Sequence, residues 1–225
     1  MDNTQTFETN DAITTDQIGC HADLETIVAR HRQTRWQKPI PEHTRLAADE
    51  ALRWLREQGR DEVILDSFCG TGLSTQALTQ KYPNAAVIGV DKSASRLGRH
   101  LPGPGCYRLL RAECEPFWRC LNEAGVPLSG HYLLYPNPWP KARQLKRRIH
   151  GHPAFPLIAS LGGDIEIRSN WEIYIREFAK ACKAIGISGA VDTVTPEVPL
   201  SLFERKYHER GQSLWRFRGQ VIALQ

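Results

Sequence analysis

The sequence predicts a doubly wound α/β fold with a mostly parallel sheet. Apolar runs typical of buried parallel strands occur at 63–68, 86–91, 107–111 and 131–135. Helical patterns separate these runs, so that strand and helix alternate roughly every 20 to 30 residues. A tight glycine turn, Cys69-Gly-Thr-Gly72, joins the first strand to the helix that follows it.

Four helices are expected in the first half of the chain. The first spans 44–58, with Thr44 as a candidate N-cap and Gly59 behind its last turn. The other three span 73–81, 93–100 and 114–124. The last of them accommodates Pro116 only in its first turn, where the missing amide hydrogen has no helical partner to lose.

The second half of the chain continues the alternation. Gly162-Gly163 turns the chain into a strand at 165–168, and Ser169 with Asn170 can cap the helix that follows. The apolar face of that helix, with spacings of three and four residues, consists of Trp171, Tyr174, Ile175, Phe178 and Cys182. A final strand is expected through 214–217.

Charge is distributed unevenly along the chain. The 225 residues carry a formal net charge of +4, which favours polyanionic partners without proving one. The segment 1–29 nevertheless contains six carboxylates and no lysine or arginine. We therefore expect a disordered polar tail over 1–29 and a single domain over 30–225.

Composition also narrows the setting of the protein. No apolar run approaches the roughly 20 residues of a membrane span, and no signal peptide opens the chain. The six cysteines lack CxxC pairing, as is typical of reduced cytoplasmic thiols, so neither a disulfide framework nor a metal site is expected. A monomer and a homodimer both remain open.

A glycine motif and two strand-end acids form the first candidate site. Asp66 precedes Gly70 and Gly72, which allow the backbone to approach a ligand closely, and Asp91 ends the next strand. A carboxylate at that second position can accept hydrogen bonds from both hydroxyls of a ribose. The pattern lacks the third glycine of a dinucleotide fingerprint and suits S-adenosylmethionine, which has no phosphate. The alternative is an ordinary βα turn.

A proline-rich loop and a basic run form the second candidate site. Prolines at 136, 138 and 140 force a stiff, extended exit from the strand 131–135, beside Asn137 and Trp139. Five cations follow: Lys141, Arg143, Lys146, Arg147 and Arg148. This combination indicates a base held above a phosphate backbone, with cations that position the substrate. The alternatives are a solvated charged face and a Trp139 that belongs to the core.

Two further strand ends carry polar side chains. Glu113 follows the strand 107–111 and would lie near an adenine, or it is simply a solvated acid. Asn170 follows the strand 165–168, where it serves as a helix cap, as a substrate contact, or as both.

Several of these motifs resemble the tRNA (guanine-N7)-methyltransferase family. The most specific piece is Pro136-Asn-Pro-Trp-Pro-Lys141 followed by Lys146-Arg-Arg148, where the family has Pro-Asp-Pro-Trp-x-Lys and then Lys-Arg-Arg. Ser201-Leu-Phe-Glu204 resembles the family's Thr-Lys-Phe-Glu, and Ser169-Asn170 resembles its Thr-Asp. The resemblance extends from about 62 to 217.

The resemblance implies a class I methyltransferase sheet with S-adenosylmethionine as methyl donor. It implies a guanine of tRNA as acceptor, the variable-loop guanosine 46. Carried over by position, the donor pocket comprises Asp66, Gly70, Gly72, Asp91, Glu113 and Asn137. The RNA contacts comprise Lys141, Arg143, Lys146, Arg147, Arg148, Asn170, Ser201 and Glu204.

The sequence departs from the family pattern at the acceptor side. Asn137 and Asn170 replace two aspartates, and Ser201-Leu202 replaces Thr-Lys. Methylation of guanine N7 needs no general base, so orientation supplies most of the acceleration, while a carboxylate stabilises the charge that develops on the base. Glu204 is then the expected charge-stabilising residue, with Asn137 orienting the base or donor. The rival functions are a diverged methyltransferase with another acceptor and a non-catalytic tRNA-binding relative.

Overall fold

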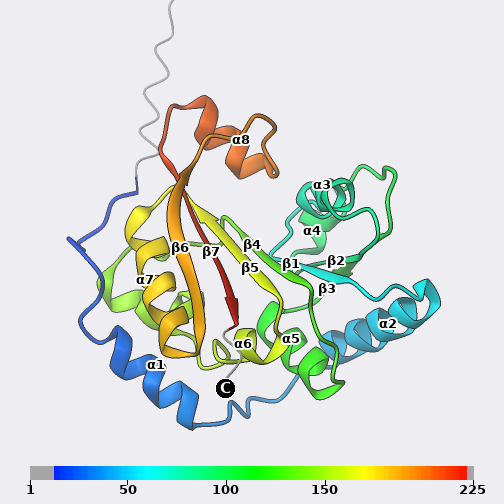
Figure 1. The fold of residues 1–225 in the computed structure, drawn as a ribbon, viewed down its shortest axis with the longest axis horizontal. Helices are drawn as coiled ribbons and strands as arrows, with labels where there is room; N and C mark the ends of the chain where they lie inside the picture. Colours follow the sequence, from blue (N-terminus) through cyan, green and yellow to red (C-terminus); the bar gives the residue numbers. More distant parts are fainter. Residues whose placement is uncertain (1–12, 222–225) are drawn as a thin grey trace, which may run out of the picture.

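A seven-stranded sheet organises the chain (Figure 1). The computed structural model describes residues 13–221. The strand order is β3-β2-β1-β4-β5-β7-β6, with β7 antiparallel to both of its neighbours and the first five strands parallel. The strands are β1 Val63–Ser67, β2 Ala86–Asp91, β3 Tyr107–Arg111, β4 Gly130–Leu134, β5 Asp164–Ser169, β6 Ile187–Val194 and β7 Leu214–Val221. The doubly wound, mostly parallel fold is confirmed.

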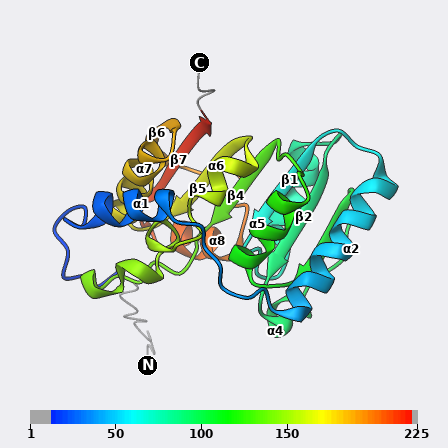
Figure 2. The ribbon, with the colours of Figure 1, turned by 90° about the horizontal axis from the view of Figure 1, so that it is seen from below.

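Helices cover the two faces of the sheet unequally (Figures 1 and 2). One face carries α1 Leu24–Gln33, α2 Glu42–Gln58, α5 Cys114–Glu123, α6 Leu157–Leu161 and α7 Glu172–Ala184. The other face carries α3 Leu73–Lys81, α4 Ala94–Leu97 and α8 Leu202–Glu209. Two short 3₁₀ helices, η1 Ala142–Arg147 and η2 Ile149–Gly151, follow the proline-rich loop.

Strand β1 shows why two cores form. Its residues are all buried, and successive side chains point to opposite faces of the sheet. Val63 and Leu65 therefore belong to the larger apolar core, whereas Ile64 belongs to the smaller one under α3. The continuous apolar run that identified this strand in the sequence reflects burial on both faces.

Some element boundaries differ from those expected. Helix α2 begins at Glu42 behind Pro41, so Thr44 is not its N-cap but a fully buried residue inside it. Helix α4 covers only Ala94–Leu97, with Ser93 as its N-cap. Strand β6 was not predicted, because only one of its eight residues is buried and the strand shows no apolar run.

The N-terminal region is more ordered than predicted. Helix α1 buries Leu24, Ile27 and Val28, which share one helical face, and packs against α7. The prediction of a disordered tail over 1–29 is therefore wrong for 24–29, which are helical, and residues 15–21 also make hydrogen bonds with the rest of the chain. The carboxylates of this segment outweighed its short apolar stripe in the sequence. Residues 1–12 lie outside the part of the chain that the structure describes.

Candidate methyl-transfer site

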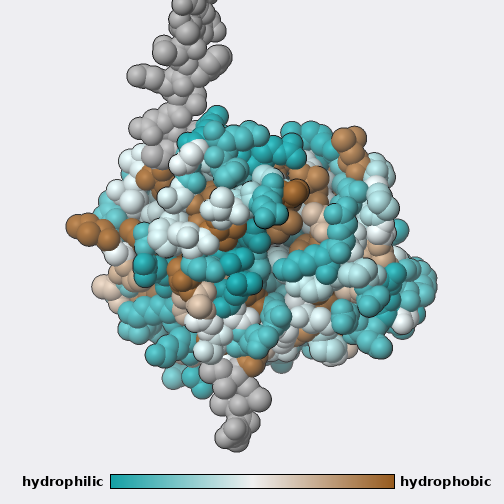
Figure 3. All heavy atoms as spheres, turned by 45° about the horizontal axis from the view of Figure 1, so that its top comes forward, coloured by the Kyte–Doolittle hydropathy of each residue, from teal (hydrophilic) through white to brown (hydrophobic). Residues whose placement is uncertain are grey.

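A crevice opens at the carboxyl ends of the parallel strands. It lies where β1 and β4 are neighbours and the strand order reverses, which is the usual ligand position in a doubly wound sheet. Two cavities of about 550 and 270 Å³ meet there and share Phe68, Arg96 and Phe203 among their lining residues. Figure 3 shows this end of the molecule, where apolar patches lie between hydrophilic residues.

A larger concavity of about 670 Å³ lies elsewhere, on the face of β5, β7 and β6 that no helix covers. Its lining is a polar stretch of sheet with Lys81 and Tyr82 at one side. Neither the glycine turn nor any of the predicted site residues borders it, so the crevice at the strand ends is the candidate site.

The glycine turn has the backbone shape that the sequence predicts. Gly70 and Gly72 adopt φ of 62° and 79°, a left-handed conformation that favours glycine. A Cβ at Gly70 would meet nothing within 4 Å, and Gly70 lines the smaller cavity. A Cβ at Gly72 would instead lie 2.5 Å from the Leu109 side chain. Gly70 therefore leaves room for a ligand, whereas Gly72 allows close internal packing.

Asp91 ties the first two strand ends together. Its carboxylate accepts hydrogen bonds from the backbone amides of Gly70 at 3.0 Å and Ser93 at 2.8 Å. The guanidinium of Arg96 lies 3.3 Å from the same carboxylate. Asp91 itself is buried and lines neither cavity, but its partner Arg96 lines both, so the Asp91 carboxylate lies directly behind the passage between them.

Asp66 supports the turn from within. Its side chain is fully buried and accepts hydrogen bonds from Ser74 at 2.6 Å and Thr75 at 2.7 Å. Burial raises the pKa of Asp66 to about 6, although both hydroxyl hydrogen bonds oppose the shift. Asp66 lines neither cavity, so its predicted direct contact with the donor is not present in this geometry. It instead anchors α3 to the end of β1.

Glu113 lines the larger cavity, as expected for a residue near the donor. Its carboxylate accepts a hydrogen bond from Thr44 at 2.6 Å and lies 2.7 Å from His43. Partial burial acts to raise the pKa of Glu113, but Thr44 and His43 outweigh it, so the pKa lies below its usual value. The carboxylate is therefore ionised at neutral pH and able to accept hydrogen bonds.

These groups fit S-adenosylmethionine. The room at Gly70, the strand-end carboxylate of Asp91 and the ionised Glu113 offer a close backbone approach and two acceptors to a ligand rich in donors. The bound donor supplies a sulfonium methyl group as electrophile. The protein has to hold that methyl group in line with the acceptor atom.

The proline-rich loop forms one wall of the larger cavity. Asn137 and Trp139 both line it, which confirms Trp139 as a cavity wall. Asn137 is exposed, and its side-chain oxygen accepts a weak hydrogen bond from the Trp139 amide at 3.4 Å. The guanidinium of Arg147 lies over the Trp139 ring, 4.9 Å from its centroid. An aromatic surface and a cation thus stand side by side.

Asn170, the residue that follows β5, lines the same cavity. Its amide group donates to the side chain of Gln212 at 2.8 Å. Asn170 does not cap α7, since the helix begins at Glu172 after Trp171, and it is Ser169 that accepts from the Trp171 amide at 3.1 Å. The carbonyl oxygen of the Asn170 side chain is left for a ligand.

The basic run divides into exposed and buried members. Arg143, Lys146 and Arg147 are exposed on η1, and Lys141 is half-buried. Arg148 is fully buried and forms an ion pair with Glu177 at 2.5 Å. The predicted contact of Arg148 with RNA phosphate is therefore wrong, because its charge faces the protein interior.

Glu204 requires a second correction. Helix α8 turns this residue toward the sheet, where its side chain is fully buried. The carboxylate accepts from Arg168 at 2.8 Å, from the Tyr135 hydroxyl at 3.0 Å and from the Leu200 amide at 2.6 Å. With its oxygens engaged in this way, Glu204 cannot stabilise charge on an RNA base, and it lines neither cavity.

Ser201 begins the same helix. Its hydroxyl accepts from the Glu204 amide at 3.1 Å as an N-cap, and it lines the smaller cavity. Arg96, Phe203 and Tyr207 also line the larger cavity and were not predicted from the sequence. The spacing of four between Phe203 and Tyr207 places them on one helical face, which is a signal that could have identified the pair.

Other site types find no support within 13–221. No group of three or more His, Cys, Asp or Glu side chains there could hold a metal ion. No helix of that segment is long and apolar enough to cross a membrane. The six cysteines are all unpaired.

Comparisons with known proteins match this geometry. A family model described as a putative methyltransferase matches residues 60–217. A tRNA (guanine-N(7)-)-methyltransferase of Pectobacterium atrosepticum is 30% identical over 70% of this chain and 72% of its own length. One of Mycobacterium ulcerans is 28% identical over 86% of this chain and 78% of its own length.

Solved structures show the same fold. An antibiotic-related methyltransferase superposes with a TM-score of 0.58 at 18% identity, covering 77% of this chain and 94% of its own. The 16S rRNA (adenine(1408)-N(1))-methyltransferase of Catenulisporales acidiphilia, determined with its cosubstrate S-adenosylmethionine, superposes with a TM-score of 0.54 at 18% identity, covering 78% of this chain and 92% of its own. By fold, family model and sequence identity, the chain belongs to the tRNA (guanine-N7)-methyltransferase family of S-adenosylmethionine-dependent enzymes.

Proposed function

We propose that this protein transfers the methyl group of S-adenosylmethionine to N7 of a guanine in tRNA, at guanosine 46 of the variable loop, in the cytoplasm. One observation carries the proposal. A single crevice combines the glycine turn and Asp91 with an aromatic wall flanked by exposed cations. The relatives named above are tRNA (guanine-N(7)-)-methyltransferases, and the unpaired cysteines fit the proposed compartment.

The acceptor base would enter through the larger cavity. Trp139 and Tyr207 supply aromatic surfaces on which an unstacked base can lie. The amide groups of Asn137 and Asn170 face the same space and can hydrogen-bond the edges of the base. Arg147 lies at the cavity wall beside Trp139, and Arg143 and Lys146 stand outside the cavity, where these exposed cations would hold the phosphate backbone.

Methyl transfer then depends on alignment. N7 of guanine has a lone pair and no proton to lose, so no residue has to act as a base. The protein brings N7, the methyl carbon and the departing sulfur into line, and this orientation supplies most of the acceleration. Because Glu204 is engaged inside the protein, Asn137 is the polar group of the loop that orients the acceptor.

Incubation with isotopically labelled S-adenosylmethionine and total tRNA tests the proposal. Nucleoside mass spectrometry should detect labelled 7-methylguanosine, and nuclease mapping should place it in the variable loop. Asp91→Ala serves as the control that impairs the donor site alone. Label in another nucleoside would identify a diverged acceptor, and tRNA binding without any transfer would identify a non-catalytic relative.

A further inference from the structure

The loop that carries Asn137 and Trp139 needs support from outside itself. Tyr135 and Trp139 adopt φ of 53° and 48°, a left-handed conformation that non-glycine residues rarely hold. The prolines at 136, 138 and 140 remove backbone donors, so the loop's own hydrogen bonding within 136–140 is limited to the weak bond from the Trp139 amide to Asn137. Something else must keep Trp139 in the cavity wall.

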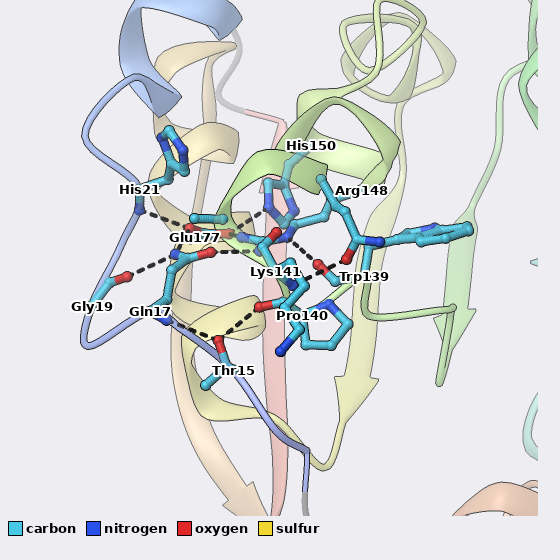
Figure 4. Close-up of polar contacts among 12 residues, drawn as sticks. Thr15, Gln17, Gly19, His21, Trp139, Pro140, Lys141, Arg148, His150 and Glu177 are labelled. Atoms are coloured by element: carbon cyan, nitrogen blue, oxygen red, sulfur yellow. Dashed lines mark hydrogen bonds and ion pairs between the residues drawn. The ribbon is translucent and has the colours of Figure 1, made fainter.

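Arg148 supplies that support from behind the loop (Figure 4). Its Nε donates to the carbonyl oxygen of Trp139 at 3.1 Å, and one terminal nitrogen donates to the carbonyl oxygen of Lys141 at 3.2 Å. The guanidinium also lies over the ring of Trp171, 4.8 Å from its centroid. Arg148 therefore grips the loop on both sides of Pro140 without lining either cavity.

The N-terminal segment contacts both Arg148 and the loop. Residues 15–21, which we name the N-terminal strap, cross over Arg148 and the loop (Figure 4). Gln17 accepts from Arg148 at 2.5 Å and donates to Glu177 at 2.9 Å, so it bridges the buried ion pair. The Thr15 hydroxyl donates to the carbonyl oxygen of Pro140 at 2.7 Å.

Glu177 is the charged centre to which strap and loop are both attached. Besides Arg148, it accepts from the His21 amide at 2.8 Å and lies 2.9 Å from Nε2 of His150. A buried guanidinium requires such a partner, because its charge would otherwise face an apolar interior. The side chains of Arg148, Glu177 and His150 are all fully buried.

We propose that Arg148 is a positioning residue for the acceptor, and that the N-terminal strap is required for it to act. Arg148 and Thr15 together hold the three successive carbonyl oxygens of 139–141 on the side away from the cavity. This arrangement directs the side chains of Asn137 and Trp139 toward the acceptor base. The inference rests on the proposed methyl transfer, whose rate depends on small displacements of the reacting atoms.

The variants should separate positioning from stability. Thr15→Ala with Gln17→Ala removes three strap contacts, to Pro140, Arg148 and Glu177, while leaving the Arg148–Glu177 ion pair in place. Arg148→Lys keeps the charge opposite Glu177, but a single ammonium cannot span the two carbonyl oxygens. The control is Asp192→Asn, which weakens a more exposed ion pair with Arg216 between β6 and β7, away from the loop.

Single-turnover transfer to tRNA at saturating donor is the first measurement. The strap variant and Arg148→Lys should each slow the transfer step about tenfold or more, with the calorimetric Kd for the donor within about twofold of wild type. Asp192→Asn should match wild type in both quantities. Transfer rates in the strap variant equal to those of Asp192→Asn would overturn the proposal, as would full activity of Arg148→Lys.

Hydrogen exchange supplies a measurement independent of catalysis. The Ala142 amide donates to Asp16 of the strap at 2.7 Å, so amides in 139–147 should exchange faster in the strap variant than in wild type or Asp192→Asn. Unchanged exchange in 139–147 would overturn the inference that the N-terminal strap supports the loop. Faster exchange in the strap variant, combined with a wild-type protein that methylates no tRNA, would instead reject the proposed function and leave the support of the loop by the strap standing.

Discussion

The two halves of the crevice are constructed differently. The donor half uses neighbouring residues of two consecutive βα turns, in which the Asp91 carboxylate directly accepts from the Gly70 and Ser93 amides. The contact with Ser93 spans two residues of sequence, and the contact with Gly70 joins two successive turns 21 residues apart. The groups that would meet the donor are therefore the same groups that a sequence motif displays.

The acceptor half joins segments that are far apart in the chain. Two buried ion pairs hold it, Arg148 with Glu177 behind the loop and Arg168 with Glu204 beneath α8. Arg148 and Glu204, which resemble RNA contacts in the sequence, thus form ion pairs inside the protein. The comparison teaches that a charged residue in a binding motif can serve the scaffold instead of the ligand, and that burial decides between the two.

The largest effect is expected from breaking one of these pairs. Glu204→Gln leaves Arg168 with Glu166 as its remaining acid, so the free energy of unfolding should fall by about 3 to 5 kcal/mol. Denaturant titration of this variant measures the loss, with the exposed Glu209→Gln on the same helix as control. A Glu204→Gln variant that is as stable as wild type but inactive would show that Glu204 takes part in the reaction.

The two halves should also respond to pH in opposite directions. Burial raises the pKa of Asp66 from 3.8 to about 6, so stability from this group is lost as pH rises through that interval. Burial also acts to raise the pKa of Glu177, but hydrogen bonds from His150, Gln17 and the His21 amide prevail and lower it from 4.5 to about 2, so its stability is lost as pH falls through that interval.

Each group should change the free energy of unfolding by about 3 kcal/mol across its interval. Unfolding free energies measured between pH 2 and 7 in wild type, Asp66→Asn and Glu177→Gln check this expectation. The Asp66→Asn curve should lose the decline between 3.8 and about 6, and the Glu177→Gln curve the rise between about 2 and 4.5. Parallel curves for all three proteins would contradict both assignments.

Donor binding should depend on the first half alone. Asp91→Ala removes the carboxylate that we expect to accept from the ribose and that holds the Gly70 amide, so calorimetry should show a loss of about 1 to 3 kcal/mol in affinity for S-adenosylmethionine or its demethylated product. Asp192→Ala, which lies at the β6–β7 edge, is the matched control. Equal donor affinity in the two variants would remove Asp91 from the donor site.

RNA binding should depend on the exposed cations of the second half. Replacing Lys146 and Arg147 by glutamine should flatten the dependence of log affinity for tRNA on log salt by about 0.7 to 0.9 per lost phosphate contact. Filter-binding titrations at several salt concentrations measure this slope. A slope equal to that of wild type would show that η1 is only a solvated face.

The smallest effect concerns the asparagine that replaces the family's aspartate. Asn137→Asp keeps an acceptor for the Trp139 amide and adds a negative charge beside the methylated base. The barrier to methyl transfer should fall by about 1 kcal/mol, the difference between a charged and a neutral hydrogen bond. The single-turnover rate should therefore rise roughly fivefold. An inactive Asn137→Asp would show that the acceptor half is adapted to an uncharged loop.

The sequence alone determined the mostly parallel sheet, the glycine turn and the family. Apolar runs identify strands buried on both faces, and glycine positions report backbone geometry directly, because few other residues adopt positive φ. These features are local in the chain. Strand β6 and helix α1 escaped prediction because their burial depends on contacts with other elements, β6 with β7 and α7, and α1 with α7 and η2.

Only the tertiary structure decided which charges face the ligand. Lys146, Arg147 and Arg148 are consecutive and chemically alike, yet the first two are exposed and the third is fully buried against Glu177, 29 residues away. Glu204 is likewise oriented by Arg168, 36 residues away. The reason is physical: the free energy of a charge depends on its distance from water and from opposite charges, and long-range packing sets both.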